Sequence, residues 1–200
     1  MSDARLEGAP THGAGQDVTP GDGADVLVRT ATGNDLDAVV RIGRRTWPAI
    51  YEPLAGPEYV AMGLAKWWTP DVVTTSIRTG RTLVAEVGGT VVGMASYGTQ
   101  GDEFVLWKLY VLPEHTGHGI GSKLMDAVVD RALESGYRRI RLSYADGNRY
   151  AARFHHAHGF VETHRESGGS GLPDSVWVVR ELDAPDEPDS GESTGAESQS

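Results

Sequence analysis

The chain has 200 residues, of which 39% are hydrophobic, with a formal net charge of −10 and no cysteine. This length suffices for one domain with a core, and the lack of cysteine excludes structural disulfides, thiolate metal sites and a cysteine nucleophile. There is no run of 18 apolar residues and no basic-then-apolar N-terminal segment, so we expect a cytoplasmic protein without a membrane segment.

Most of the negative charge lies at the two ends of the chain. Residues 1–24 carry −3 and residues 183–200 carry −6, which leaves −1 for residues 25–182. Both ends are rich in Gly, Pro, Ser, Asp and Glu, so they cannot bury enough apolar surface to offset the entropy of ordering. We predict disordered segments at 1–24 and 183–200 around a domain at 25–182, whose near-neutral charge gives no support to a nucleic-acid partner.

The domain begins with a strand and a long helical region. Apolar and β-branched residues predict a strand at 26–30, after which Asn34 or Asp35 can cap a helix. An aromatic-rich stretch interrupted by prolines then predicts bent helical segments with loops. The aromatic residues of this stretch are Trp47, Tyr51, Tyr59, Trp67 and Trp68.

The later elements follow from alternation, helical spacing and glycine stops. They are strands at 82–87, 90–97, 103–112, 139–144, 160–164 and 175–182, and helices at 119–135 and 149–158. Gly88-Gly89 predicts a hairpin between the first two of these strands, and Asn148 can cap the last helix. The order β-α-α-β-β-β-α-β-α-β-β predicts an α/β fold with a mixed sheet (α+β), unlike a doubly wound dinucleotide fold.

A glycine-rich turn, Gly117-His118-Gly119-Ile120-Gly121, joins the predicted strand 103–112 to the following helix. Free backbone N–H groups at the positive end of a helix dipole suit an anion, above all a phosphate. A P-loop is excluded because Ser122 precedes Lys123, and the dinucleotide fingerprint fails because no acidic ribose partner follows. A turn that only packs helix against strand remains the alternative.

A second motif decides between these alternatives. Asn148-Arg149-Tyr150-Ala151-Ala152-Arg153-Phe154-His155-His156-Ala157-His158-Gly159-Phe160 resembles the N-x-x-A-x-x-F-Y-x-x-x-G-F helix of the GNAT superfamily of N-acetyltransferases. Leu109–Gly121 resembles the pyrophosphate loop of the same superfamily, at the family spacing. The resemblance covers residues 25–182, and the Leu-Tyr-Val-Leu-Pro-Glu run is most similar to bacterial small-molecule or polyamine-type members.

The resemblance implies that acetyl-CoA binds between two strands that splay apart, the run ending at Leu112 and residues 139–144. The N–H of Val111 or Leu112 would polarise the thioester carbonyl. The remaining backbone and side-chain contacts implied for acetyl-CoA come from Leu109, Tyr110, Val111, Thr116, Gly117, His118, Gly119, Ile120, Gly121, Ser122 and Asn148. Thr116 stands where the family has Gln or Arg, so we expect a loop that binds mainly through backbone, with charge from His118 or Lys123.

The resemblance also implies direct attack of a primary amine on the thioester. Glu103 is our expected base, with Glu114 as an alternative, because an amine with a pKa of about 10.4 must lose a proton. His155 replaces the family's tyrosine, so we expect the imidazolium of His155 to be the acid, unless Tyr150 or Tyr144 takes that role. A packing role for His155 is an equal alternative.

The acceptor is expected to be a small amine, held through cation–π contact by one or two rings of the aromatic stretch, with help from Glu52 or Glu58. An ordinary core role for these aromatic residues is an equal alternative. Alternatives are a protein lysine or N-terminus, charged tRNA, and a non-catalytic acyl-CoA sensor. We expect no metal site, because His155 and His158 have no third ligand nearby. The sequence does not decide the oligomeric state, and a homodimer is compatible with it.

Overall fold

The computed structural model describes residues 25–169 and 171–182, so the predicted disordered segments 1–24 and 183–200 lie outside the described residues. The described elements follow the predicted order and form a seven-stranded sheet in the order β1-β2-β3-β4-β5-β7-β6. Every neighbouring pair is antiparallel except β4 and β5, which run parallel. The strands are β1 (Val26–Thr30), β2 (Thr82–Val87), β3 (Thr90–Gln100), β4 (Glu103–Val111), β5 (Arg139–Ala145), β6 (Val161–Glu166) and β7 (Ser175–Glu181).

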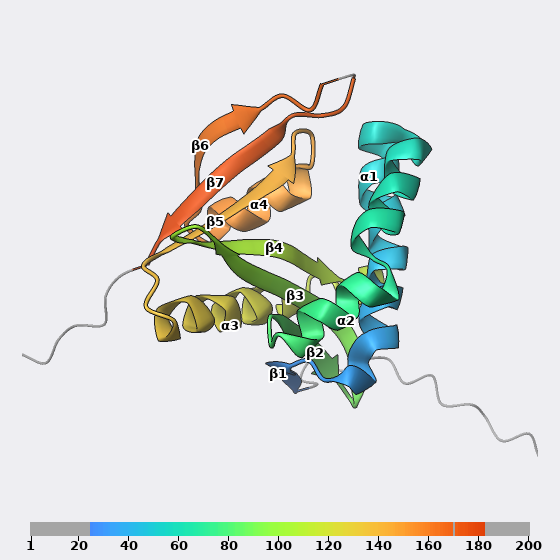
Figure 1. Cartoon of the computed structure of the whole chain (residues 1–200), viewed down its shortest axis with the longest axis vertical. Coiled ribbons are helices and arrows are strands. Elements are labelled where there is room, and N and C mark those ends of the chain that lie inside the picture. The colour runs from blue at the N-terminus through green and yellow to red at the C-terminus, as the bar shows by residue number, and fades with distance from the viewer. Residues whose placement is uncertain (1–24, 170, 183–200) are drawn as a thin grey trace, which may run out of the picture.

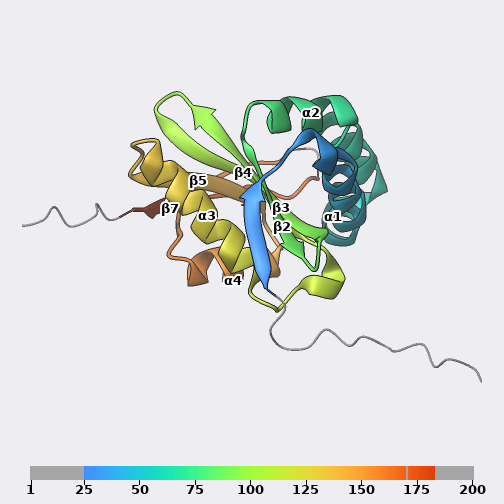
Figure 2. The ribbon, with the colours of Figure 1, turned by 90° about the horizontal axis from the view of Figure 1, so that it is seen from below.

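Helices cover both faces of this sheet. Figure 2 shows α1 and α2 on one side of the strands and α3 and α4 on the other. The helices are α1 (Leu36–Trp67), α2 (Pro70–Arg78), α3 (Ile120–Glu134) and α4 (Arg149–Ala157). The predicted mixed α/β fold is therefore confirmed. No helix in the part of the chain that the structure describes has the length and apolar character to cross a membrane.

The helix α1 is bent, as the prolines predicted. Gly56 has φ 80 and ψ 169, a conformation that interrupts the helix just before Pro57. On either side of the break, indole rings lie against glycines: a Cβ on Gly43 would overlap the ring of Trp68, and one on Gly63 would lie 2.5 Å from the ring of Trp47. The close approach brings the aromatic residues of α1 into one cluster against β4.

The strands β4 and β5 separate soon after they meet (Figure 1). Their parallel pairing includes only Phe104 with Ile140 and Val105 with Arg141. Next along β4, Ser96 of β3 pairs with Lys108 and Tyr97 pairs with Leu106, so Trp107 between them has no partner. Such a β-bulge bends its strand and increases the local twist. The bulge at Trp107 therefore turns the end of β4 away from β5.

The side chain of Asp35 does not cap α1 as predicted but binds Arg29 of β1. Its carboxylate is buried and accepts hydrogen bonds from the Arg29 guanidinium at 2.8 and 2.9 Å and from the Thr32 backbone N–H at 2.7 Å. It accepts no bond from the N–H groups of α1. The hydrogen bonds from Arg29 are the main reason that the pKa of Asp35 falls to about 2. Asp35 thus ties α1 to β1.

We expect Asp35→Asn to lower the free energy of unfolding at pH 7 by about 2 kcal/mol, because the folded state stabilises the charged carboxylate. This contribution is present above the ordinary pKa of 3.8 and is lost as the pH falls through about 2. Urea denaturation across this pH range measures it. Asp126→Ala, on the exposed side of α3, is the control and should change stability by less than about 0.5 kcal/mol. Equal effects of the two substitutions would contradict the assignment.

Candidate active site

A cleft of about 330 Å³ lies where β4 and β5 diverge. We call the part next to α1, lined by Thr46, Tyr51, Lys108 and Tyr110, the α1 half, and the part next to α4 the α4 half. The α4 half is lined by residues that include Leu109, Gly121, Tyr144, Asn148, Tyr150, Phe154 and His155. Side chains alternate along a strand, so successive residues of β4 face the two halves in turn.

The backbone of β4 offers polar groups to the cleft at alternate residues. The Leu112 N–H donates to the Val92 carbonyl at 2.8 Å, which makes this a hydrogen-bonded pair of the antiparallel β3–β4 ladder. By the alternation of such ladders, the backbone of Tyr110 also faces β3, whereas that of Leu109 and Val111 faces the open side where β5 has turned away. Of the two N–H groups predicted to polarise the thioester, that of Val111 is therefore free to meet a ligand and that of Leu112 is not. The backbone of Tyr110 likewise faces β3 instead of the cleft.

The glycine-rich turn forms the start of α3. Gly117 and Gly119 have φ 82 and φ 75, which glycine adopts without strain. The first intrahelical bond of α3 is donated by the Lys123 N–H to the Gly119 carbonyl, so the N–H groups of Ile120, Gly121 and Ser122 precede it and have no partner within the helix. The turn is exposed and includes His118, while the side chain of Ile120 is buried in the core.

The Thr116 side chain is occupied within the turn. Its hydroxyl donates to the Pro113 carbonyl at 2.8 Å. Thr116 and Gly121 line the cleft. The turn therefore offers backbone N–H groups instead of a long basic side chain, as the replacement of Gln or Arg by Thr116 predicted.

The helices α3 and α4 pack closely at this point. A Cβ on Gly121 would lie 3.1 Å from the Phe154 ring, so glycine allows the approach. His158 Nδ1 lies 2.8 Å from the Phe154 carbonyl, to which it donates, and His158 Nε2 lies 3.1 Å from Ser122 Oγ. Asn148 caps α4 as predicted, because its side chain accepts from the Ala151 N–H at 3.1 Å. These contacts hold the start of α3 against α4.

His155 lines the cleft, but its environment disfavours the charged ring. It lies among Tyr144, Phe154 and Phe160, with ring centroids 6.0, 5.3 and 5.5 Å away, and its buried Nδ1 has no hydrogen-bond partner among the described residues. Burial, with a smaller effect of His158, lowers the pKa of His155 to about 4. Desolvation therefore favours the neutral ring at neutral pH, which argues against the expected imidazolium.

Two phenols line the cleft near His155. Tyr150 stands in the first turn of α4 with 61% of its surface exposed, and Tyr144 lies on β5. Burial is the main reason that the pKa of Tyr144 is raised. Both phenols therefore line the same cleft as His155.

Neither predicted carboxylate base lines the cleft. Glu103 lies at the start of β4, where this strand still pairs with β5, and its carboxylate accepts a hydrogen bond from Arg141 at 2.5 Å. Glu114 is exposed and forms an ion pair with Arg45 at 2.6 Å. The ion pair between Glu103 and Arg141 joins the two strands on the side away from the opening. Neither carboxylate is therefore placed to take a proton directly from an amine in the cleft.

The α1 half contains a charged residue that the sequence reasoning missed. Lys108 Nζ donates to the Trp67 carbonyl at 2.7 Å and lies 4.5 Å from the ring centroid of Trp68. Burial lowers the pKa of Lys108 to about 8. Tyr51 and Tyr110 lie beside it with hydroxyl oxygens 3.4 Å apart. The sequence signal that could have pointed to Lys108 is its position as the one basic residue in the otherwise apolar second part of β4.

One ring of the predicted aromatic acceptor pocket reaches the cleft. Of the aromatic residues predicted for it, Tyr51 lines the cleft. The others pack around Trp47, whose ring centroid is 6.2, 5.5 and 6.5 Å from those of Tyr59, Trp67 and Trp68. Glu52 and Glu58 are exposed and do not line the cleft. No group of three or more His, Cys, Asp or Glu side chains with metal-binding geometry occurs in residues 25–169 and 171–182.

Comparisons with known proteins give a consistent result. Residues 36–160 match the sequence model of the Acetyltransferase (GNAT) family. The L-methionine sulfoximine/L-methionine sulfone acetyltransferase of Salmonella typhimurium is 36% identical over 86 residues, which cover 40% of this chain and 50% of that protein. The thialysine N-epsilon-acetyltransferase of Bos taurus is 38% identical over 113 residues, which cover 50% of this chain and 66% of that protein. The matches thus span about half to about two thirds of these relatives.

The fold is also similar to that of solved structures. The crystal structure of the PaiA N-acetyltransferase from Thermoplasma acidophilum in complex with coenzyme A superposes with a TM-score of 0.71. The match covers 79% of this chain and 99% of that one at 19% sequence identity. At this identity the likeness establishes the fold.

The environment of His155 predicts an unusual titration. We expect NMR to give a midpoint near pH 4 for the His155 ring, assigned with the His155→Phe variant. Because the unfolded ring titrates at about 6.5, the neutral ring stabilises the folded state above that pH, and this contribution is lost as the pH falls toward 4. The His155→Phe variant should lose this pH dependence of unfolding. A midpoint between pH 6 and 7 would contradict the assignment.

Proposed function

The chain belongs to the Acetyltransferase (GNAT) family, and from this premise we propose that it transfers the acetyl group of acetyl-CoA to a primary amine of a small molecule. The observation that carries the proposal is the divergence of β4 and β5 beside a helix N-terminus with free N–H groups. The names of the relatives from Salmonella typhimurium and Bos taurus, which refer to acetyltransferases of small amino-acid-like compounds, support it.

The residues of the cleft fit acetyl-CoA. The backbone of Leu109 and Val111 faces the opening between the strands and would bind the pantetheine arm as an added strand would. The N–H groups of Gly117 through Ser122 would hold the pyrophosphate, with His118 and Lys123 adding positive charge. The Asn148 side-chain oxygen accepts from the Ala151 N–H, which leaves its amide N–H groups to donate into the cleft.

The chemistry needs a polarised carbonyl and a neutral amine. Acetyl-CoA would supply the acetyl group as an activated thioester. The Val111 N–H is the donor that we assign to the thioester oxygen, since it faces the opening and the Leu112 N–H is bonded to Val92. The described cleft has no Asp or Glu in its lining, so we assign removal of the amine proton to water, which passes it to bulk solvent. The neighbouring hydroxyls of Tyr51 and Tyr110 would relay the proton, each giving up one proton as it accepts another.

The proton donor to the leaving sulfur is a phenol in this proposal. A neutral imidazole with a pKa of about 4 has no acidic proton to give at pH 7, which argues against His155. A phenol with a pKa near 10 is well matched to a thiolate, whose ordinary pKa is about 8.5. We assign the role to Tyr150, whose hydroxyl is the more accessible, with Tyr144 as its alternative.

The proposed acceptor is a small-molecule amine, and the proposed compartment is the cytoplasm. Support for the compartment comes from the sequence alone. A homodimer is compatible with the sequence, and size-exclusion chromatography with light scattering would measure the oligomeric state.

Acetyl-CoA binding tests the cleft directly. We expect calorimetry to detect binding of both acetyl-CoA and CoA. The Gly119→Ala substitution should lower the affinity for both about tenfold, because a Cβ at φ 75 shifts the turn that carries the N–H groups. Gly89→Ala is the matched control: this residue has φ 79 and equally open surroundings, but lies in the β2–β3 hairpin. It should bind as the unchanged protein does. If the unchanged protein binds neither compound, the proposal is wrong.

Thiol release with a panel of amines tests the chemistry. We expect Tyr150→Phe to lower kcat about 100-fold while acetyl-CoA binding is retained, because general acid catalysis contributes about that much. His155→Phe should retain most of the turnover. If Tyr144→Phe alone abolishes turnover, the donor is Tyr144. Binding of acetyl-CoA without transfer to any amine would indicate a non-catalytic acyl-CoA sensor.

A further inference from the structure

The ammonium of Lys108 is a partly buried cation without an acidic partner. Its Nζ donates one hydrogen bond, to the Trp67 carbonyl, and lies over the ring of Trp68. None of the ion pairs among the described residues includes Lys108. An ammonium carries three donors, so two of them remain for a ligand in the α1 half of the cleft.

The surroundings stabilise this charge without neutralising it. Trp67 is the last residue of α1, and the carbonyl end of a helix carries about half a negative charge. The face of an indole ring also attracts a cation. Burial opposes these effects and lowers the pKa of Lys108 to about 8, which leaves most of the side chain charged at pH 7. Burying a charge is costly unless it is paired, so an anionic ligand would find a favourable site here.

The charge of the cleft lining favours one class of acceptor. The described residues that line the cleft include no Asp, Glu or Arg, and Lys108 is the one lysine among them. The other titratable base in the lining, His155, is neutral at pH 7. A diamine or polyamine would bring a second cation into a cleft without a carboxylate to receive it. An amine that also carries a carboxylate would complete the ion pair that Lys108 lacks.

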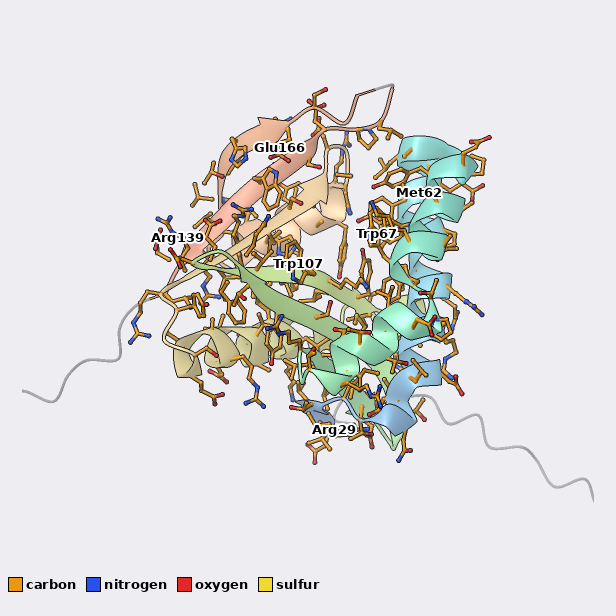
Figure 3. All side chains as sticks on the ribbon, in the orientation of Figure 1. Arg29, Met62, Trp67, Trp107, Arg139 and Glu166 are labelled. Carbon is orange, nitrogen blue, oxygen red and sulfur yellow. The ribbon has the colours of Figure 1, made fainter. Side chains whose placement is uncertain are left out.

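The position of Lys108 brings this charge close to the proposed reaction. Lys108 precedes the two β4 residues whose backbone faces the opening, Leu109 and Val111, and β4 rises about 3.3 Å per residue. Its side chain lies on the α1 face of the sheet, together with Tyr51 and Tyr110. Figure 3 shows Trp67, whose carbonyl accepts from Lys108, on the side of α1 that faces the sheet. The charge thus faces the part of the cleft that the acceptor would occupy.

We propose that Lys108 forms an anion subsite that binds a carboxylate of the acceptor, so that the acceptor is an amino acid or a related amine with a carboxylate and not a polyamine. This inference rests on the proposed acetyltransferase function. Lys108 acts here as a specificity-determining residue: it holds the end of the acceptor that does not react, and it takes no part in proton transfer.

The test compares acceptors that differ only in the carboxylate. Thiol release is measured with L-methionine sulfone, L-lysine and S-aminoethylcysteine, each beside its carboxamide, and with putrescine and spermidine. We expect the full-length protein to prefer the acids over their amides about tenfold or more in kcat/KM, the usual effect of a hydrogen-bonded charge, with the difference mainly in KM. The two polyamines should be the poorest acceptors.

Lys108→Gln is the informative variant, since its amide can still donate to the Trp67 carbonyl but carries no charge. It should bring the ratio of kcat/KM for acid and amide close to one, whereas Lys108→Arg should keep the preference for the acid. Lys66→Gln is the matched control, because Lys66 also lies over an indole ring, 5.2 Å from the centroid of Trp67, but is exposed and outside the cleft. The ratio is measured within one preparation, so partial unfolding of a variant does not change it.

The outcomes separate this inference from the proposed function. Transfer to polyamines or amides in preference to acids overturns the anion subsite and leaves the acetyltransferase proposal standing. The anion subsite is also overturned if Lys108→Gln lowers kcat/KM equally for the acid and its amide, because that result shows a structural role for Lys108. If acetyl-CoA binds but no amine in the panel is acetylated, the proposed function fails and the subsite fails with it.

Discussion

The short pairing between β4 and β5 is the constraint on which the rest of the site depends. Two residue pairs join these parallel strands before the bulge at Trp107 turns β4 aside. Buried backbone N–H and C=O groups are costly without partners, so a strand edge left open inside a protein is a place for a ligand. The opening lies in the middle of the sheet, and residues of α1 and of α4 line it. A peptide-like arm that adds to this edge would satisfy the groups that the bulge exposes.

The alternation of β4 lets one strand serve two purposes. Its odd-numbered residues Leu109 and Val111 turn their backbone toward the opening, where we propose that acetyl-CoA binds. Its even-numbered residues Lys108 and Tyr110 place their side chains against α1, where we propose that the acceptor binds. Because both sets belong to one short strand, the reacting groups would meet within a few ångströms. The bend of α1 at Gly56 and the glycines beneath Trp47 and Trp68 bring the aromatic cluster against this strand.

The charge of the cleft contrasts with that of the chain. The net charge is −10, and most of it lies in residues 1–24 and 183–200. Within the described residues, the cleft is lined by one lysine and by no carboxylate, and the exposed start of α3 adds the positive end of a helix. Glu103 and Glu114 are held by Arg141 and Arg45 away from the opening. The cleft therefore offers two positive regions, one suited to a pyrophosphate and one that we assign to a carboxylate.

The sequence by itself determined the features that arise from short-range patterns. Alternation, glycine stops and caps such as Asn148 predicted the order of the elements, and the spacing of two motifs predicted the family. Tertiary structure decided what depends on residues far apart in the chain. Arg141 lies 38 residues from Glu103 and removes it from the cleft, and the rings packed around His155 keep it neutral. The unpaired charge of Lys108 is visible only once α1 covers β4, because burial and the lack of a partner are properties of the packed structure and not of a local pattern.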